Sequence, residues 1–395
     1  MATETTDYVL IEDAKALDQF INENKNISWL SFDTEFVGEK RYVTLICLIQ
    51  VGTENGFYLI DPLKVKNLYP FFDLLQDPSI VKITHAGEND YRLIYREFGL
   101  LPKNVFDTQV AAGFVGYKFP ASFRSLVENE AGVYLRKGYT VSDWESRPFN
   151  AKQLKYALDD VLYLKGLWEA LSAKLETTGR AEWVKEEFAK MELKEHYEID
   201  LYREALSSNM INRLQPQGQA FLIRLYEWRR QQAERKNYSK EMVLSSKLIG
   251  PIIKNINSGK QALKNHRRIP NHIVEHHWDR FNALYQEKIT DEEREVMSRI
   301  PAPLPDNSGQ ETPMELIHLL LKLKCEKEQM AMGLLFYSVN LRRMKADMHY
   351  FDEKLDRGWR KTFIGEAMAH WLKNRDRLDI QFEQSQCIIK MGEES

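Results

Sequence analysis

The segment Ile27–Phe36, ISWLSFDTEF, decides the fold, because it reads as a buried strand that leads into two acidic residues. Apolar, aromatic and β-branched side chains dominate its first half, as in strands generally. Asp33 and Glu35 stand two positions apart, and alternate side chains of a strand share one face. The sequence therefore predicts that both carboxylates project from the same surface of a sheet.

Similar short apolar runs follow at 44–51, 57–60 and 80–85, and a helical pattern covers 91–98. This alternation predicts an α/β domain with a mixed sheet over residues 1–198. Apolar residues at spacings of three and four then predict one long helix over 151–178. The remainder of the chain is predicted to be almost wholly helical.

Two segments are expected to separate modules in this helical part. Residues 199–212 form a plausible junction, and residues 300–313 (IPAPLPDNSGQETP) hold four of the thirteen prolines. Proline, glycine and serine together are typical of linkers. The predicted helical modules cover 211–298 and 313–395, and their arrangement around the first domain is left open.

The composition excludes several classes of protein. With 395 residues and 43% hydrophobic residues, the chain is long enough for two or three domains, each with its own core. Cys47, Cys325 and Cys387 are far apart, so neither a disulfide scaffold nor a thiolate zinc site is expected, and a reducing, cytoplasmic location is predicted. There is no apolar run of membrane-spanning length and no basic leader, so no membrane association or export is expected.

The net charge of −3 conceals an uneven distribution. Residues 1–200 carry 23 basic and 32 acidic residues, whereas residues 201–300 carry 18 basic and 11 acidic residues. The acidic part contains the candidate metal ligands, and the basic part could attract a polyanion. Solvated helix faces would explain the same charges, and both interpretations stay open.

A second acidic position follows the strand at 80–85, in the sequence His85-Ala86-Gly87-Glu88-Asn89-Asp90. Asp90 falls on the apolar stripe of the next helix, and a carboxylate there needs a partner. The positive end of the helix dipole could supply one, which is a purely structural alternative to metal binding.

A third position lies in the predicted helix at 151–178, where Tyr156 and Asp160 are four residues apart. Side chains at this spacing lie on one side of a helix. Asp33, Glu35, Asp90 and Asp160 together offer only oxygen ligands, which Mg²⁺ and Mn²⁺ prefer. Two such ions can hold a phosphodiester for in-line attack.

The order D-x-E, H-A-G-x-x-D and Y-x-x-x-D resembles the DEDDy exonucleases, specifically the ribonuclease D family. The segments FDTEFVGEKRYVTLICLIQVG, FDTQVAA, SDWESRPF and QLKYALDDVLYL carry the resemblance over roughly residues 7–190. Residues 211–298 resemble an HRDC module, and 313–395 resemble a second, more divergent one. The resemblance implies a ribonuclease H-like, DnaQ-like exonuclease domain followed by two all-α HRDC-like domains.

The resemblance also implies an activity: stepwise 3′-to-5′ hydrolysis of RNA, including precursor tRNA 3′ ends, to nucleoside 5′-monophosphates. Two divalent cations, Mg²⁺ or Mn²⁺, are implied, bound by the four carboxylates named above. Tyr156 is implied to orient the nucleophile or to help deprotonate it. Thr34 and His85 are implied as contacts with the terminal nucleotide.

The basic module supplies candidate RNA contacts from its own residues, since Lys and Arg beside aromatic rings can follow a phosphate backbone and stack bases. A solvated bundle with a tryptophan in its core is the structural alternative. The candidates are Trp228, Arg229, Arg230, Arg267 and Arg268.

Other functions are weighed against this one. His272, Glu275 and His276 fit a zinc-peptidase pattern, but a third ligand is missing. No phosphate-binding glycine loop is present, so no nucleotide cofactor is expected. A DNA-directed exonuclease and a catalytically silent RNA-binding adaptor stay as alternatives, and the chain is expected to be a monomer.

Overall fold

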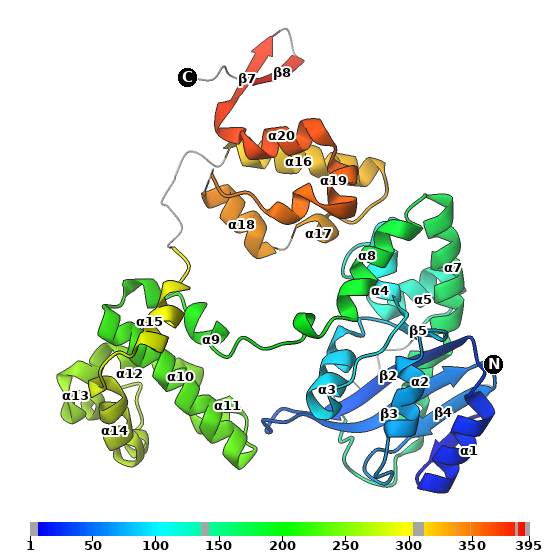
Figure 1. The fold of residues 1–395 in the computed structure, drawn as a ribbon, viewed down its shortest axis with the longest axis horizontal. Helices are drawn as coiled ribbons and strands as arrows, with labels where there is room; N and C mark the ends of the chain where they lie inside the picture. Colours follow the sequence, from blue (N-terminus) through cyan, green and yellow to red (C-terminus); the bar gives the residue numbers. More distant parts are fainter. Residues whose placement is uncertain are drawn as a thin grey trace. The chain divides into compact units, whose positions relative to one another are not determined.

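The strand that carries Asp33 and Glu35 lies inside a six-stranded mixed sheet of the computed structural model (Figure 1). The structure describes residues 7–135, 142–302, 312–336, 338–347, 349–383 and 386–391. The sheet has the order β1-β4-β3-β2-β5-β6; β3 and β4 run antiparallel, whereas β1–β4, β2–β5 and β5–β6 are parallel pairs. The strands are β1 (Val9–Ile11), β2 (Trp29–Val37), β3 (Leu45–Thr53), β4 (Gly56–Ile60), β5 (Val81–Thr84) and β6 (Val105–Asp107).

This sheet confirms the predicted α/β class, and four of its strands match the predicted runs. Strands β1 and β6 are three residues each, too short to give a periodic signal in the sequence. The helices of this region are α1 (Ala14–Asn24), α2 (Tyr69–Gln76), α3 (Glu88–Phe98), α4 (Thr108–Phe114), α5 (Phe123–Ala131), α6 (Ala151–Leu162), α7 (Leu164–Thr177) and α8 (Ala181–Met191).

The single helix predicted over 151–178 is wrong, because α6 and α7 are separated at Tyr163. The Val161 carbonyl accepts a hydrogen bond from the Ser31 hydroxyl at 3.4 Å. A side chain that enters the helical hydrogen-bond ladder is a common cause of a break. The hydrophobic period continues across the break, since Val161 and Leu164 are both buried, so the sequence did not reveal it.

The chain divides into two compact units, which we describe separately. The first comprises residues 1–35, 46–197 and 304–395, and the second comprises 36–45 and 198–303. The second unit is helical, as predicted, around a core that contains Phe221, Trp228 and Phe281. Its helices are α9 (Arg203–Leu206), α10 (Pro216–Lys236), α11 (Lys240–Val243), α12 (Ser246–Asn255), α13 (Lys260–Asn265), α14 (Asn271–Gln286) and α15 (Asp291–Ser298).

The last part of the chain belongs to the first unit. It contains α16 (Thr312–Lys327), α17 (Met332–Leu335), α18 (Ser338–Ala346), α19 (Gly358–Ile364) and α20 (Glu366–Lys373), followed by the antiparallel pair β7 (Leu378–Glu383) and β8 (Gln386–Met391). The prediction of an almost wholly helical remainder is therefore wrong for 378–383 and 386–391. The segment LDIQFE alternates apolar and polar residues, which is a strand signal that the helical interpretation overlooked. The expected linker at 300–313 lies largely outside the described residues.

Helices α17 and α19 pack against the α/β part of this unit through specific polar contacts. The Ala331 amide donates to the Gly113 carbonyl at 2.7 Å. Glu187 of α8 accepts from the Trp359 indole at 2.6 Å and from the Arg360 guanidinium at 2.8 Å. Residues far apart in sequence thus share one continuous core, which joins the two parts of this unit.

No described helix is both long enough and apolar enough to cross a lipid bilayer.

Candidate active site

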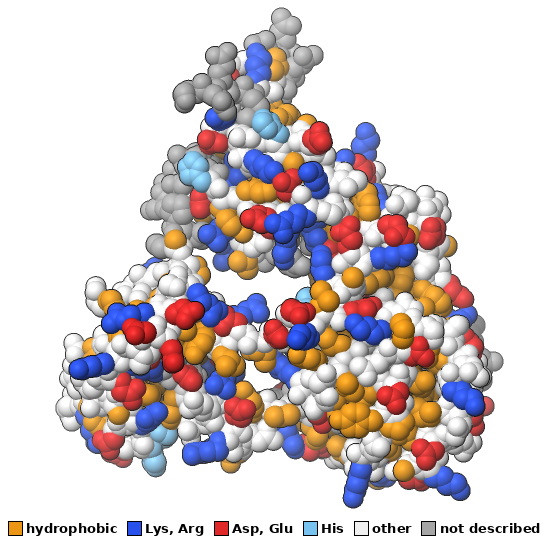
Figure 2. Space-filling view, viewed as in Figure 1, with side chains coloured by type: hydrophobic (Ala, Val, Ile, Leu, Met, Phe, Trp, Pro, Cys, Tyr) orange, Lys and Arg blue, Asp and Glu red, His pale blue; other side chains and the backbone are white. Residues whose placement is uncertain are grey.

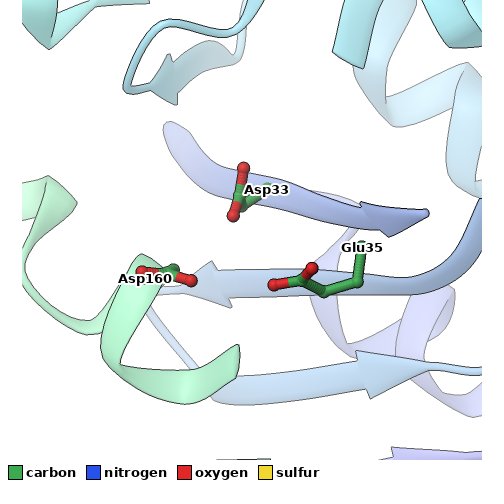
Figure 3. Close-up of side chains that lie close together, drawn as sticks. All are labelled: Asp33, Glu35 and Asp160. Carbon is green, nitrogen blue, oxygen red and sulfur yellow. The ribbon is translucent and has the colours of Figure 1, made fainter. Parts of the chain in front are cut away.

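Strand β2 presents Asp33 and Glu35 on one face, and Leu30 and Phe32 on the other. Phe32 is fully buried and its ring lies 5.8 Å from that of Tyr91. Asp33 and Glu35 therefore point to the opposite surface, where helix α6 covers the sheet. Oxygen atoms of Asp33, Glu35 and Asp160 lie within 4.8 Å of one another. Figure 3 shows the three carboxylates directed toward a common point, two from the strand and one from the helix.

Burial and mutual repulsion control the protonation of these carboxyl groups. Burial, and then the charges of Asp90, Asp160 and Glu35, raises the pKa of Asp33 well above its usual value. Burial, and then the charges of Asp160 and Asp90, raises the pKa of Glu35 to about 8, and burial raises that of Asp160 to about 7. Without a counter-ion, these carboxyl groups stay partly protonated near neutral pH. A divalent cation would favour their ionised form, and carboxylate oxygens are ligands that such cations prefer.

Asp90 is buried beside this group, in the first turn of α3. It accepts a short hydrogen bond from the Thr34 hydroxyl, and burial raises its pKa to about 6. Its charge raises the pKa of both Asp33 and Glu35, which places it within electrostatic range of them. The carboxylate thus has a side-chain partner in addition to the helix dipole.

The turn before α3, which contains His85-Ala86-Gly87 and leads to Asp90, restricts which residues can occupy it. Ala86 has a φ of 56°, and a Cβ on Gly87 would lie 2.5 Å from the Thr84 hydroxyl. The Gly87 amide donates to the buried Asp107 carboxylate at 2.8 Å, and the same carboxylate caps α4. Asp107 was not predicted as a site residue, although an acid at the start of a helix is a capping signal.

His85 lies at the end of β5, where its Nδ1 is 2.9 Å from the Thr108 hydroxyl. Its ring is 5.4 Å from that of Phe123, and burial lowers its pKa. The side chain is therefore held as a neutral ring between α4 and α5. A contact with a terminal nucleotide stays a prediction for both His85 and Thr34.

Tyr156 lies one turn before Asp160 on α6, and its hydroxyl is close enough to the Asp160 carboxyl to lower the pKa of that group. Burial and the neighbouring carboxylates raise the pKa of this tyrosine far above its usual value. The protonated hydroxyl is therefore strongly favoured in the metal-free site. This favours an orienting role over a role as a general base.

The segment 142–149 supports Tyr156 through contacts that the sequence did not predict. The Trp144 ring lies 6.2 Å from that of Tyr156. Arg147 binds the buried Asp61 through two hydrogen bonds, of 2.6 and 2.8 Å, and stacks over Phe149 at 3.8 Å. Asp61 and Arg147 are separated by 86 residues, so no local pattern connects them.

In the second unit, two predicted RNA contacts are wrong because the structure buries them. Trp228 is 6% exposed and packs edge-on against Phe281. Arg229 is 2% exposed and donates to the Glu241 carboxylate and the Lys240 carbonyl. Arg230 forms an ion pair with Glu234 at 3.2 Å. These three side chains therefore have their partners within the second unit.

Arg267 and Arg268 are exposed, as an RNA contact requires. They line a cavity of about 500 Å³ together with Lys254 and His266. On the face in Figure 2, basic and acidic side chains are interspersed over this unit, without one continuous positive surface. The cavity is thus a local concentration of positive charge.

The zinc-peptidase pattern is not assembled as a metal site. The His276 ring bonds the His272 carbonyl at 2.7 Å, and Glu275 forms an ion pair with Lys264 at 3.1 Å. Among the described residues, Asp33, Glu35 and Asp160 are the one group of three or more potential ligands with a suitable geometry.

Comparisons with known proteins agree with this geometry. Residues 8–176 match a family described as 3′-5′ exonuclease. The chain is 30% identical to ribonuclease D of Nitrobacter hamburgensis, over 87% of this chain and 89% of that protein, and 31% identical to ribonuclease D of Pseudomonas paraeruginosa, over 92% and 97%. Its structure resembles that of Escherichia coli RNase D, described as an exoribonuclease involved in structured RNA processing, with a TM-score of 0.78 and 25% identity over 93% of this chain and 98% of that one.

Proposed function

The chain belongs to the ribonuclease D family of 3′-to-5′ exoribonucleases, and on this premise we propose that it shortens RNA by a two-metal mechanism at the carboxylates of β2, α3 and α6. The observation that carries the proposal is the convergence of Asp33, Glu35 and Asp160 within 4.8 Å. Three partly buried carboxylates repel one another, and a divalent cation between them would remove that cost.

Each carboxylate has a proposed role. Asp33, Glu35 and Asp160 would hold the ion beside the attacking water, while Asp33 and Asp90 would hold the second. Bound there, Mg²⁺ or Mn²⁺ supplies a nucleophilic hydroxide at neutral pH and neutralises charge on the leaving oxygen. The Thr34 hydrogen bond keeps Asp90 ionised, because it lowers the pKa of that carboxyl against the effect of burial.

Tyr156 is proposed to orient the water that attacks the terminal phosphodiester. Its hydroxyl acts on the Asp160 carboxyl, whose pKa it lowers, so it lies beside the proposed metal ligands before RNA binds. Contact of its ring with Trp144 limits rotation of the ring. Tyr156→Phe should therefore lower kcat more than it changes KM.

The proposed substrate is single-stranded RNA with a free 3′ end, including the 3′ ends of precursor tRNA, and we expect the chain to act as a monomer. The helical modules at 211–298 and 313–395 are proposed to be HRDC-like domains. Arg267 and Arg268, with Lys254, are proposed to hold the phosphate backbone of the RNA. Their double replacement should flatten the salt dependence of RNA binding.

The decisive experiment follows shortening of a 5′-labelled RNA in the presence of Mg²⁺ or Mn²⁺. We expect a ladder that shortens from the 3′ end, and loss of activity in Asp33→Asn and Asp160→Asn. Asp291→Asn is the matched control, because Asp291 and Glu293 form the same D-x-E pattern at an exposed helix start. Full activity in Asp33→Asn would reject the proposed site, and inactivity of the wild-type chain would favour the adaptor alternative.

The same assay on a DNA of identical sequence separates the two nuclease alternatives. Carboxylates that bind metal ions do not distinguish the sugars, whereas contacts with the 2′-hydroxyl do. A strong preference for RNA is expected, and equal rates on DNA would favour the DNA-directed alternative.

A further inference from the structure

Gln50 is a buried polar residue on β3 that no role described so far explains. Its side chain is 0% exposed, and neither amide atom has a hydrogen-bond partner among the described residues. Leaving such a group unpaired in the core destabilises the fold. A residue that carries this cost is expected to find its partner in another state of the molecule.

The pairing of β2 with β3 places Gln50 directly beside the acidic group. These strands are neighbours joined by residues 38–44, which is too short for a parallel crossover, so they are antiparallel. Gly52 stands opposite Ser31, because a Cβ at Gly52 would lie 2.6 Å from the Ser31 hydroxyl. Two residues further along each strand from this pair, Gln50 stands opposite Asp33. Both side chains lie on the face of the sheet that carries Ser31.

The neighbours of Gln50 along β3 and on β4 cannot satisfy its amide. Leu59 is its partner on β4, and Leu48 and Gly52 flank it along β3. None of these three residues has a polar side chain, whereas Asp33 stands directly opposite Gln50 on β2. Side chains directly opposite on antiparallel strands have Cβ atoms about 4.5–5.5 Å apart, within reach of a glutamine amide.

We propose that Gln50 is a positioning residue, whose Nε2 donates a hydrogen bond to the Asp33 carboxylate when that carboxylate binds a divalent cation. The inference rests on the proposed metal site and extends it by one residue. The hydrogen bond fixes which Asp33 oxygen faces the cation. Outer hydrogen bonds of this kind typically change metal affinity by about 10–100-fold.

The test uses the full-length chain and compares Gln50→Met with the wild type. Methionine keeps the length and approximate volume of glutamine but has no amide. Mn²⁺ binding, followed by electron paramagnetic resonance, should weaken by about ten-fold or more. Thermal unfolding in EDTA should give an unchanged or higher Tm, because an unpaired polar group leaves the core.

The opposite pattern would overturn the inference. If Gln50→Met lowers the Tm in EDTA but binds Mn²⁺ with wild-type affinity, Gln50 acts in packing alone. Gln50→Leu serves the same comparison if the methionine variant fails to fold. Gln76→Met, at the exposed end of α2, is the matched control, and it should change neither measurement.

A parallel measurement on Asp33→Asn separates this inference from the proposed function. Wild-type Mn²⁺ affinity in Asp33→Asn would reject the metal site itself and the inference with it. Weak binding in Asp33→Asn together with unchanged binding in Gln50→Met would reject only the role of Gln50.

Discussion

The Thr34 hydroxyl donates a hydrogen bond to the Asp90 carboxylate, and so connects strand β2 to helix α3 behind the acidic group. Thr34 alternates with Asp33 and Glu35, so its side chain leaves the opposite face of the strand. The strand that carries two candidate metal ligands therefore also fixes a third carboxylate through its other face.

Thr34→Val removes this hydrogen bond and keeps the shape of the side chain. Hydrogen bonds to charged groups contribute about 1.5–3 kcal/mol, so kcat/KM should fall by about 10–100-fold. The bond lowers the pKa of Asp90, so its loss should move the acidic limb of the pH–rate profile to higher pH. Thr34→Ser should restore most of the activity; a valine variant with the wild-type profile would contradict this role.

Removal of divalent cations should make stability fall as pH rises. In the metal-free protein the pKa of Asp160 is about 7 and that of Glu35 is about 8, both above the unfolded-state values. Such groups stabilise the fold while protonated, and this contribution is lost as pH rises through the folded-state pKa. The Tm in EDTA should therefore decrease from about pH 5 to about pH 8, and Mg²⁺ should reverse the decrease.

Glu35→Gln provides the control for this pH dependence. The variant has one fewer ionising group in the cluster, so its Tm in EDTA should depend less on pH than that of the wild type. Equal slopes for the two proteins would show that other carboxyl groups cause the effect.

Gly87→Ala should destabilise the turn that leads to Asp90. The new Cβ would lie 2.5 Å from the Thr84 hydroxyl oxygen and 2.8 Å from the Thr84 Cβ. Overpacking of this kind costs about 1–3 kcal/mol, which urea unfolding would measure. Gly166→Ala in α7 is the matched control, because its Cβ meets open space and alanine favours a helix by about 1 kcal/mol.

Arg180→Met should weaken the attachment of the C-terminal helices. The guanidinium donates to the Phe114 carbonyl at 2.6 Å, the Gln329 carbonyl at 3.0 Å and the Glu328 carbonyl at 2.5 Å. Unpaired buried acceptors cost about 1–3 kcal/mol each, so the urea midpoint should fall clearly. Lys185→Met on the exposed side of α8 should leave it nearly unchanged; equal effects would argue against the buried contacts.

The predictable part of the site depends on local periodicity. Asp33 and Glu35 share a face because a strand alternates, and Tyr156 meets Asp160 because a helix repeats every 3.6 residues. These relationships hold whatever the tertiary structure is. The burial of Trp228 was also readable, because it continues the buried stripe of Phe221 and Leu225 along α10.

The remaining contacts depend on tertiary structure. Asp107 meets the Gly87 amide, and Arg147 meets Asp61, only once distant segments are folded together. Nothing near Arg229 in the sequence distinguishes it from an exposed arginine, because its partner Glu241 lies on another helix. Gln50 reads as an ordinary strand residue until the pairing with β2 is known.

The packing of α17 and α19 on α4 and α8 has a consequence for biosynthesis. Trp359 and Arg360 cover Glu187, yet the ribosome makes them more than 170 residues later. The nascent exonuclease part must therefore expose this apolar surface until α19 has been translated. Termination before α19 would therefore leave a catalytic fragment with an uncovered, aggregation-prone face.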